Sequence, residues 1–359
     1  MKVTKRLLSV LLSVLIVVSA FMALPFTVNA ATSSEGFSYE ENYDGSITIK
    51  GYTGSDTEVV IPSEIDGKPV TEIGDLAFQN CTNLTSIVIP DRVIEIGGWA
   101  FSNCTGLTNV TIGNSVEAIG AATFENCTGL TNVTIKNGVE KIGYAAFSGC
   151  KRLTTIVIPD SVTALDNEAF GNCTGLTDAT IGNGVEEIGS STFSGCTRLT
   201  NVTIGNSVEK IESLAFRNCI SLTSIVIPDS VTVIGSEAFE NCTELTTIVI
   251  PNSVTEIGSK TFSSCNNLTI YGYSDSYAES YAKKERIPFV PLDSTLGDVN
   301  LDGNIDVTDA TYIQMSVADL TELSDEAKAN ADVNRDGIID VTDATLVQMF
   351  AANAIDSFE

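Results

Sequence analysis

Apolar residues recur along the chain with a period of 23 residues between Leu84 and Asn267. Eight gapless units fill this range, and the same seven positions are apolar in every unit. A fixed period of this length is typical of a solenoid, in which each coil buries its apolar side against its neighbours. The pattern therefore predicts a mainly β solenoid of eight 23-residue repeats over residues 84–267. In the first unit the seven apolar positions hold Leu84, Ile87, Ile89, Val93, Ile96, Phe101 and Cys104.

Each unit is predicted to contain a short strand, a turn, a second extended run and a brief turn that carries the phenylalanine. Residues 87–89 have the side-chain alternation of a strand. The dipeptide Pro90-Asp91 indicates the turn after this strand, as Gly113-Asn114 does in the next unit.

The sequence departs from the period at both ends of the repeats, as the caps of a stacked array do. Residues 31–83 are predicted to form an N-terminal cap and an irregular first repeat, with a hairpin near Asp44-Gly45 and an insertion near Asp66-Gly67. Residues 268–292 are predicted to form a C-terminal cap with a final strand, a short helix and an extended end. The helix is indicated by Tyr277, Tyr281 and Lys284, and the extended end by Ile287, Pro288 and Phe289.

Residues 1–30 are predicted to be a signal peptide that is removed on secretion. A basic start is followed by an apolar run and by small residues that suit cleavage. No later stretch is apolar enough to span a bilayer. The mature protein is therefore expected to leave the cell in soluble form. These features are Lys2, Lys5 and Arg6, the apolar run 7–24, and Val28, Asn29 and Ala30.

The charge of the chain limits its partners and its chemistry. Removal of residues 1–30 lowers the 19 basic residues to 16, against 46 acidic residues, so the mature net charge is −30. This charge disfavours nucleic acid and anionic lipid as partners, and it favours calcium, a cation that prefers oxygen ligands. The sequence contains no histidine, which excludes catalysis and zinc sites that depend on imidazole.

Nine cysteines follow one another at intervals of 23 residues, from Cys81 to Cys265. Equivalent residues of stacked coils point their Cβ atoms in the same direction, and nine is an odd number. We therefore expect a ladder of buried, reduced thiols in preference to disulfides or metal sites. The same positions create Asn-x-Thr strings, such as Asn103 to Thr105, that match a glycosylation sequon. Because the middle residue is the packed cysteine, we expect no modification there.

The outward positions of the predicted strand ladder are small, polar and almost uncharged, as at Asn109 and Thr111 or at Thr155 and Val157. Carbohydrate platforms usually present aromatic rings, which this ladder lacks, so a sugar-binding face is not expected. Catalysis on the solenoid is not expected either. Near-identical coils present the same side chains in rows, whereas an active site needs unlike residues that converge in a pocket.

Two 12-residue loops near the end of the chain have the spacing of calcium-binding loops. Oxygen ligands stand at positions 1, 3, 5, 9 and 12, a backbone carbonyl at position 7, and a glycine, Gly303 or Gly337, at the sharp turn. Each loop gathers four carboxylates whose repulsion opposes closure without a divalent cation, so we expect folding to be coupled to two Ca2+ ions. The predicted ligands are Asp298, Asn300, Asp302, Asn304, Asp306 and Asp309 in loop one, and Asp332, Asn334, Asp336, Ile338, Asp340 and Asp343 in loop two.

A helix is expected after each loop. Ile313 and Met315 in the first helix, and Val347 and Met349 in the second, are expected to lie on apolar faces that pair the two helices with each other. The C-terminal module is thus predicted to be small, all-α and calcium-binding.

The repeat motif L-x-x-I-x-I-P-x-S-V-x-x-I-G-x-x-A-F-x-x-C resembles the BspA-like leucine-rich repeat, a family of bacterial extracellular proteins. The resemblance covers about two-thirds of the mature chain and implies a leucine-rich solenoid. It implies no particular ligand, because related repeats serve in adhesion, in host contact and in unassigned binding.

The duplicated segment VNxDGxIDVTDAT, with aspartate at position 12 and no regular helix before loop one, is similar to type I dockerins of plant-fibre-degrading anaerobes. This resemblance implies a dockerin over residues 298–359, after a linker at residues 293–297, and a cohesin domain of a scaffold protein as partner. It also implies cohesin contacts that are identical in the two halves, so that the partner could bind in either of two orientations. The implied contacts are Val307, Thr308, Gln314 and Met315, and their copies Val341, Thr342, Gln348 and Met349.

Together these features predict a secreted, non-catalytic component of a cellulosome-like complex, which docks through the dockerin. The solenoid is displayed either as a binding module for a protein, cell-surface or plant cell-wall ligand or as a spacer. Two alternatives stay open at this point. The chain is an accessory or enzymatic subunit in plant polysaccharide degradation, or it is an adhesin of the cell surface. A straight repeat offers no cleft for the pair of carboxylates that a glycosidase needs, and this disfavours an enzyme.

Overall fold

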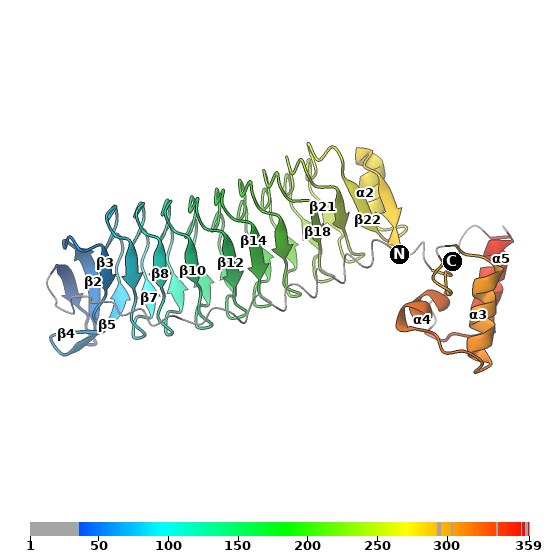
Figure 1. Ribbon diagram of the computed structural model, residues 1–359, viewed down its shortest axis with the longest axis horizontal. Coiled ribbons are helices and arrows are strands. Elements are labelled where there is room, and N and C mark those ends of the chain that lie inside the picture. Colours follow the sequence, from blue (N-terminus) through cyan, green and yellow to red (C-terminus); the bar gives the residue numbers. More distant parts are fainter. Residues whose placement is uncertain are drawn as a thin grey trace.

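The computed structural model describes residues 36–292, 296–302, 304–334, 337–352, 354–355 and 358. These residues form a β solenoid of stacked coils and a small helical module (Figure 1). The predicted signal peptide lies outside the described residues, as do residues 293–295 of the predicted linker. Within the described ranges, no helix has the length and apolar character needed to cross a membrane.

One face of the solenoid is a row of short parallel strands, one from each coil. The row divides into three hydrogen-bonded sheets. Within the regular repeats, paired strands are in register at the 23-residue period, as Asn109 is with Asn132. Side chains alternate along a strand, so Ile225 is buried between the exposed Ser224 and Val226. The row consists of β3 (Glu58–Val60), β6 (Ser86–Val88), β8 (Asn109–Thr111), β10 (Asn132–Thr134), β12 (Thr155–Ile158), β14 (Asp178–Ile181), β16 (Asn201–Thr203), β18 (Ser224–Val226), β20 (Thr247–Val249), β22 (Thr269–Gly272) and β23 (Phe289–Pro291).

A second face holds two-residue strands that also pair in parallel, in two sheets that divide between residues 165 and 187. Each ends on a buried aliphatic residue, and these residues stack in register, as Ile142 does on Ile119. The two rows confirm the predicted mainly β solenoid. The second row continues from β5 and consists of β7 (Glu95–Ile96), β9 (Ala118–Ile119), β11 (Lys141–Ile142), β13 (Ala164–Leu165), β15 (Glu187–Ile188), β17 (Lys210–Ile211), β19 (Val233–Ile234) and β21 (Glu256–Ile257).

The third side of each coil is a turn whose backbone passes twice through the left-handed region. The first left-handed position holds residues of many kinds, including Trp99, Glu168 and Lys260, with φ between 51° and 64°. This conformation costs a non-glycine residue about 1–2 kcal/mol. Hydrogen bonds to the next coil offset that cost, as the Trp99 N–H donates to the Ala121 carbonyl at 2.8 Å. The second left-handed position holds asparagine, glycine or serine.

Nine phenylalanines, one from each coil, stack through the core of the solenoid. Adjacent ring centroids are 4.9–5.6 Å apart, and the rings are within 18° of parallel. Tyr52 stacks on the first ring at 5.5 Å, and Tyr281 meets the last ring edge-on at 5.9 Å. Both ends of the stack are therefore closed by an aromatic residue of a cap. The stack consists of Phe78, Phe101, Phe124, Phe147, Phe170, Phe193, Phe216, Phe239 and Phe262.

All nine cysteines are free, and all but Cys81 are buried. Each buried thiol donates a hydrogen bond to the phenylalanine carbonyl of the preceding coil, with S···O distances of 3.0–3.3 Å. Burial raises the pKa of Cys127 and of Cys173 to about 12, so these thiols are neutral at physiological pH. The predicted ladder of reduced thiols is confirmed.

Two hairpins form the N-terminal cap. The first closes at the predicted Asp44-Gly45 turn, where the Ser46 N–H donates to Asp44 at 2.9 Å and Gly45 has a φ of +83°. The second closes at Asp66-Gly67, the site of the predicted insertion. These hairpins pair β1 (Phe37–Glu41) with β2 (Ile47–Tyr52), and β4 (Glu64–Ile65) with β5 (Lys68–Ile73).

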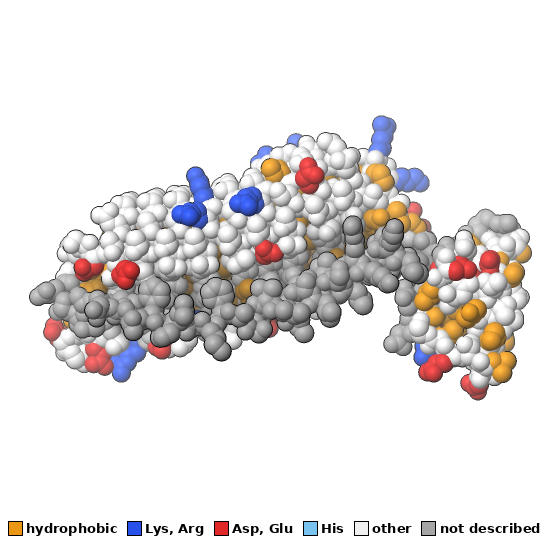
Figure 2. Space-filling model, viewed as in Figure 1, with side chains coloured by type: hydrophobic (Ala, Val, Ile, Leu, Met, Phe, Trp, Pro, Cys, Tyr) orange, Lys and Arg blue, Asp and Glu red, His pale blue; other side chains and the backbone are white. Residues whose placement is uncertain are grey.

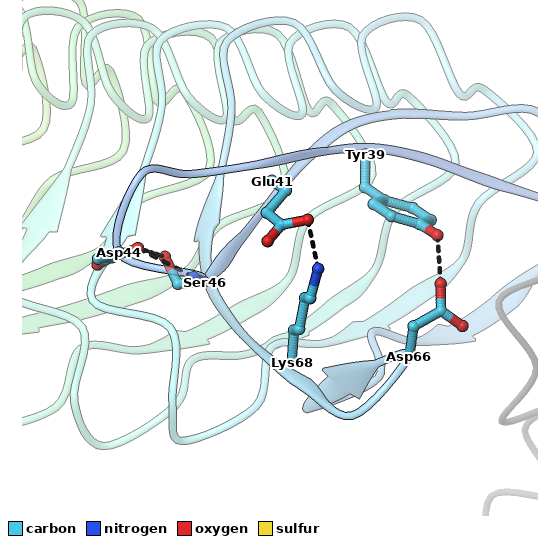
Figure 3. Close-up of polar contacts among 6 residues, drawn as sticks. All are labelled: Tyr39, Glu41, Asp44, Ser46, Asp66 and Lys68. Carbon is cyan, nitrogen blue, oxygen red and sulfur yellow. Dashed lines mark hydrogen bonds and ion pairs between the residues drawn. The ribbon is translucent and has the colours of Figure 1, made fainter.

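Polar contacts join the two hairpins (Figure 3). The Tyr39 hydroxyl donates to Asp66 at 2.7 Å, and Lys68 forms an ion pair with Glu41. Because both pairs are exposed to solvent, we expect each to contribute little to stability. Both contacts run from the first hairpin to the second.

The C-terminal cap follows the last full coil. It contains β22, the helix α2 (Tyr277–Glu285) and β23. The Ser276 side chain caps α2 by accepting the Glu279 N–H at 3.1 Å, and Arg286 ends the helix in the left-handed conformation. This strand, helix and extended end correspond to the three elements expected from the sequence.

The helical module consists of α3 (Val307–Val317), α4 (Asp325–Ala331) and α5 (Val341–Ala351). Helices α3 and α5 pack together, with Ile313 and Val347 fully buried between them. The prediction that Met315 and Met349 share this contact is wrong, because their side chains are 37% and 39% exposed. Each methionine lies two residues after the buried position, which is more than half a helical turn away.

Candidate calcium centre and docking faces

Loop one, residues 298–309, is held by hydrogen bonds from its backbone to its own side-chain oxygens. The Asp302 N–H donates to Asp298 Oδ1 at 3.1 Å and to Asn300 Oδ1 at 2.8 Å. The Asn304 N–H donates to Asp302 Oδ1 at 2.8 Å. The side chains predicted as ligands at positions 1, 3 and 5 are thus ordered around one tight turn.

Loop two, residues 332–343, shows the same fold in its described part. The Gly337 N–H donates to Asp332 Oδ2 at 3.0 Å. Gly337 has a φ of +85°, and a Cβ there would have no atom within 4 Å. Glycine is therefore needed for the backbone conformation and not for space. Two predicted positions, Asp336 of this loop and Gly303 of loop one, lie outside the described residues.

The aspartates at position 12 are fully buried and close both loops. Asp309 Oδ1 accepts the N–H groups of Val299 and Asn300 at 2.8 and 3.0 Å, and its Oδ2 accepts the Asp306 N–H at 2.8 Å. Asp343 repeats these three bonds in loop two, at 2.9–3.3 Å. A buried carboxylate needs such partners or a cation, so each position 12 ties the start of a loop to its end.

The aspartates at position 9 cap the helices that follow. Asp306 accepts the N–H and the hydroxyl of Thr308, each at 2.7 Å, and Asp340 accepts the Thr342 N–H at 2.6 Å. These hydrogen bonds hold the pKa of both carboxyls below the usual value. Because the ionised cap also completes a capping box with position 12, loop and helix form one unit.

The donors of the two loops suit a hard cation. Loop one offers four carboxylates and two asparagines, with no sulfur and no imidazole, and two of its carboxylates, Asp298 and Asp309, are buried. Over the described residues, no three Asp, Glu, Cys or His side chains stand together as a ready metal cage. The fit to calcium therefore rests on the chemistry and the order of the donors.

The residues predicted to contact a partner lie on the outer sides of α3 and α5. Val307, Thr308, Gln314 and Met315 are all exposed, as are their copies Val341, Thr342, Gln348 and Met349. Other exposed residues of these helices were not among the predicted contacts. Thr311, Tyr312 and Thr345 are exposed, and Thr311 and Tyr312 lie one helical turn after Val307 and Thr308. Counting four residues on from the predicted contacts would have found them.

The solenoid presents a surface of different character. Figure 2 shows a face of the solenoid on which most of the described surface is neither charged nor hydrophobic. A shallow open groove on the solenoid is lined by residues of five successive coils, from Thr71 to Ser161, and includes Arg92, Glu117 and Glu140. No residue predicted as a ligand or partner contact lines this groove.

Comparison with known families agrees with both parts of the fold. The model of the BspA type leucine-rich repeat region matches residues 52–177 and 168–279, in 6 copies. The model of the dockerin type I domain matches residues 296–350. No curated protein matches the chain.

Two solved structures illustrate the likeness of the solenoid. The chain is 29% identical to the leucine-rich repeat protein TpLRR of T. pallidum, with a TM-score of 0.51 over 59% of this chain and 89% of that one. It is also 29% identical to a leucine-rich repeat protein from Bacteroides ovatus, with a TM-score of 0.56 over 69% of this chain and 71% of that one.

Type I dockerins bind calcium and pair with cohesin domains, so calcium binding and a cohesin partner follow from the second match. The first match covers more than half of the chain. The chain therefore belongs to the BspA-type leucine-rich repeat proteins and carries a C-terminal type I dockerin domain.

Proposed function

We propose that this protein is a secreted, non-catalytic subunit of a cellulosome-like complex, in which the dockerin binds a cohesin of a scaffold protein and the solenoid is displayed. The observation that carries the proposal is the pair of matching exposed faces on α3 and α5, each of which begins at a capped loop. Exposed valine and methionine on an otherwise acidic module are typical of a protein interaction surface.

Each loop holds one Ca2+ ion in this proposal. The ion supplies the positive charge that offsets the repulsion of four carboxylates. The chain itself orders the carboxylates through backbone N–H groups and starts a helix at position 10, so an ordered loop also orders a docking face. The proposed ligands are Asp298, Asn300, Asp302, the Asn304 carbonyl, Asp306 and Asp309, and Asp332, Asn334, Asp336, the Ile338 carbonyl, Asp340 and Asp343.

The cohesin contacts in this proposal are the two equivalent sets on the outer helix faces. Each set combines apolar side chains with a threonine and a glutamine that can form hydrogen bonds. Because the two sets have the same residues, a cohesin can bind in either of two orientations, with α3 or with α5 as the main contact. The sets are Val307, Thr308, Gln314 and Met315, and Val341, Thr342, Gln348 and Met349.

The solenoid acts as the displayed module, and it binds a protein or a surface rather than transforming a substrate. Its outward strand positions, such as Asn132 and Thr134, repeat in register from coil to coil. A regular, almost uncharged face of this kind supports contact over many coils. Similar side chains in rows do not supply the unlike groups of an active site.

Retention of the full chain on an immobilised type I cohesin tests the docking role. We expect retention in calcium and release by a chelator. Met315→Glu combined with Met349→Glu places a charge on both faces and should abolish retention. Val157→Glu combined with Val226→Glu adds the same charges to exposed positions of the solenoid and should leave retention intact. Equal retention of both double variants would contradict the assignment of the docking faces.

A further inference from the structure

The two docking faces are equally exposed at the positions that they share. Val307 on α3 is 60% exposed and Val341 on α5 is 62% exposed, while Met315 and Met349 are 37% and 39% exposed. A partner that contacts only these positions would bind both faces alike. Any difference in strength must come from the residues beside them.

The first such difference is at Tyr312, whose equivalent on α5 is Leu346. Tyr312 lies four residues after Thr308, so the two side chains are neighbours on the helix surface. Tyr312 is 42% exposed, whereas Leu346 is partly buried against the core of the module. The α3 side thus offers an aromatic ring and a hydroxyl where the α5 side offers neither.

The second difference is at Leu320, whose equivalent is Ala354. The same backbone turn follows both helices, since the Leu320 N–H donates to the Met315 carbonyl and the Ala354 N–H donates to the Met349 carbonyl, both at 2.8 Å. Leu320 is 73% exposed. At the same place beyond the methionine, the α3 side therefore exposes a leucine and the α5 side only a methyl group.

The one larger apolar residue of α5 is not available to a partner in the same way. Phe350 stands where α3 has Ser316, and its ring packs against Phe358 with centroids 4.8 Å apart. A Cβ at Gly297 would lie only 2.8 Å from the Phe358 ring, so this ring also packs close to the start of the module. Phe350 is half-buried in this contact, so it is less open to a partner than the exposed Leu320 of the α3 side.

We infer that the two faces differ in strength and that the α3 face, defined as Val307, Thr308, Tyr312, Met315 and Leu320, is the dominant docking surface for cohesin. This inference rests on the proposed docking role. Tyrosine is over-represented among the residues that dominate protein interfaces, and Leu320 extends the apolar area beside it. Tyr312 and Leu320 are then the residues that set which orientation is preferred.

The test compares matched substitutions in the full chain by calorimetric titration with a type I cohesin in calcium. Met315→Glu should weaken binding by about tenfold more than Met349→Glu, although the two methionines are equally exposed. When Met349→Glu is already present, the further substitutions Tyr312→Leu and Leu320→Ala make α3 resemble α5. They should lower the cohesin affinity to that of the Met315→Glu variant. Circular dichroism of each variant in calcium checks that α3 and α5 are folded.

Each outcome decides a separate point. Equal losses for Met315→Glu and Met349→Glu, or a larger loss for Met349→Glu, would overturn the inference and leave the docking role intact. Absence of binding by the unaltered chain to every cohesin tried would overturn the docking role and, with it, the inference. Met315→Glu could lower the cohesin affinity more than Met349→Glu does, while Tyr312→Leu with Leu320→Ala leaves the affinity of the α3 face unchanged. This result would show that other residues cause the asymmetry and would reject Tyr312 and Leu320 as its source.

Discussion

Removal of one ring from the phenylalanine stack should weaken the solenoid around the coil that carries it. Phe170 is fully buried, and its ring centroid lies 5.3 Å from that of Phe147 and 5.6 Å from that of Phe193. Truncation of a buried phenylalanine to alanine costs about 3–5 kcal/mol, because apolar area is lost and a cavity remains. Each stacked pair accounts for about 0.5–1.5 kcal/mol beyond area alone. We therefore expect Phe170→Ala to lower the free energy of unfolding by about 3–5 kcal/mol.

Urea unfolding followed by far-UV circular dichroism, with calcium present throughout, measures this loss. Val157→Ala lies in the same repeat unit but is 61% exposed, so it serves as the control and should change stability by less than about 0.5 kcal/mol. Trp99, the single tryptophan, reports on another coil of the solenoid. Since coils interact only with their neighbours, its fluorescence transition should separate from the circular dichroism transition in Phe170→Ala. A loss no larger than that of the control would refute the account of the core.

Further substitutions and titrations test the backbone, the loops and the thiols. Asn172 has a φ of +57°, so Asn172→Ala should lower the free energy of unfolding by about 1 kcal/mol, whereas Asn172→Gly should change it by less than about 0.5 kcal/mol. Thermal unfolding of the two variants distinguishes them, and equal effects would contradict a conformational cause. Asp309→Asn removes one carboxylate from loop one and should weaken one of two calcium affinities by at least about tenfold in calorimetric titration; two unchanged affinities would count against this ligand assignment. Burial raises the pKa of Cys127 and Cys173 from 9.0 to about 12, so the folded state favours the neutral thiol. The contribution of these neutral thiols to the free energy of unfolding should be complete below pH 9 and should fall as the pH rises toward 12. Denaturant unfolding across this pH range measures it, and a free energy that does not change with pH would contradict the buried ladder.

Much of the solenoid follows from the 23-residue period alone. A position that is apolar in every unit must lie on the inner side of every coil, and Phe101 and Cys104 are indeed fully buried. The parallel direction of equivalent residues also explains why the cysteines are free. The dockerin module was equally accessible to prediction, because its two loops repeat a fixed spacing of oxygen-bearing side chains.

Other features could not be predicted, since they depend on contacts between coils or on the angular position of a side chain. Trp99 and Lys260 have no preference for the left-handed conformation, and an inter-coil hydrogen bond holds Trp99 in it. The short helix α4 lacks a long apolar period. The exposure of Met315 could be predicted only from its angle around the helix axis, which places it opposite the buried Ile313. The contrast between Tyr312 and Leu346 is visible in the sequence, but its meaning depends on which side chain is exposed.

The most direct test of the central claim is calorimetric titration of the full chain against a panel of type I cohesins, first in calcium and then with excess chelator. The account predicts tight binding to at least one cohesin in calcium and loss of that binding in chelator, because the loops order the docking faces. Calcium binding and folding of the module without binding to any cohesin would contradict the docking role, and binding that persists in chelator would contradict the role of the loops.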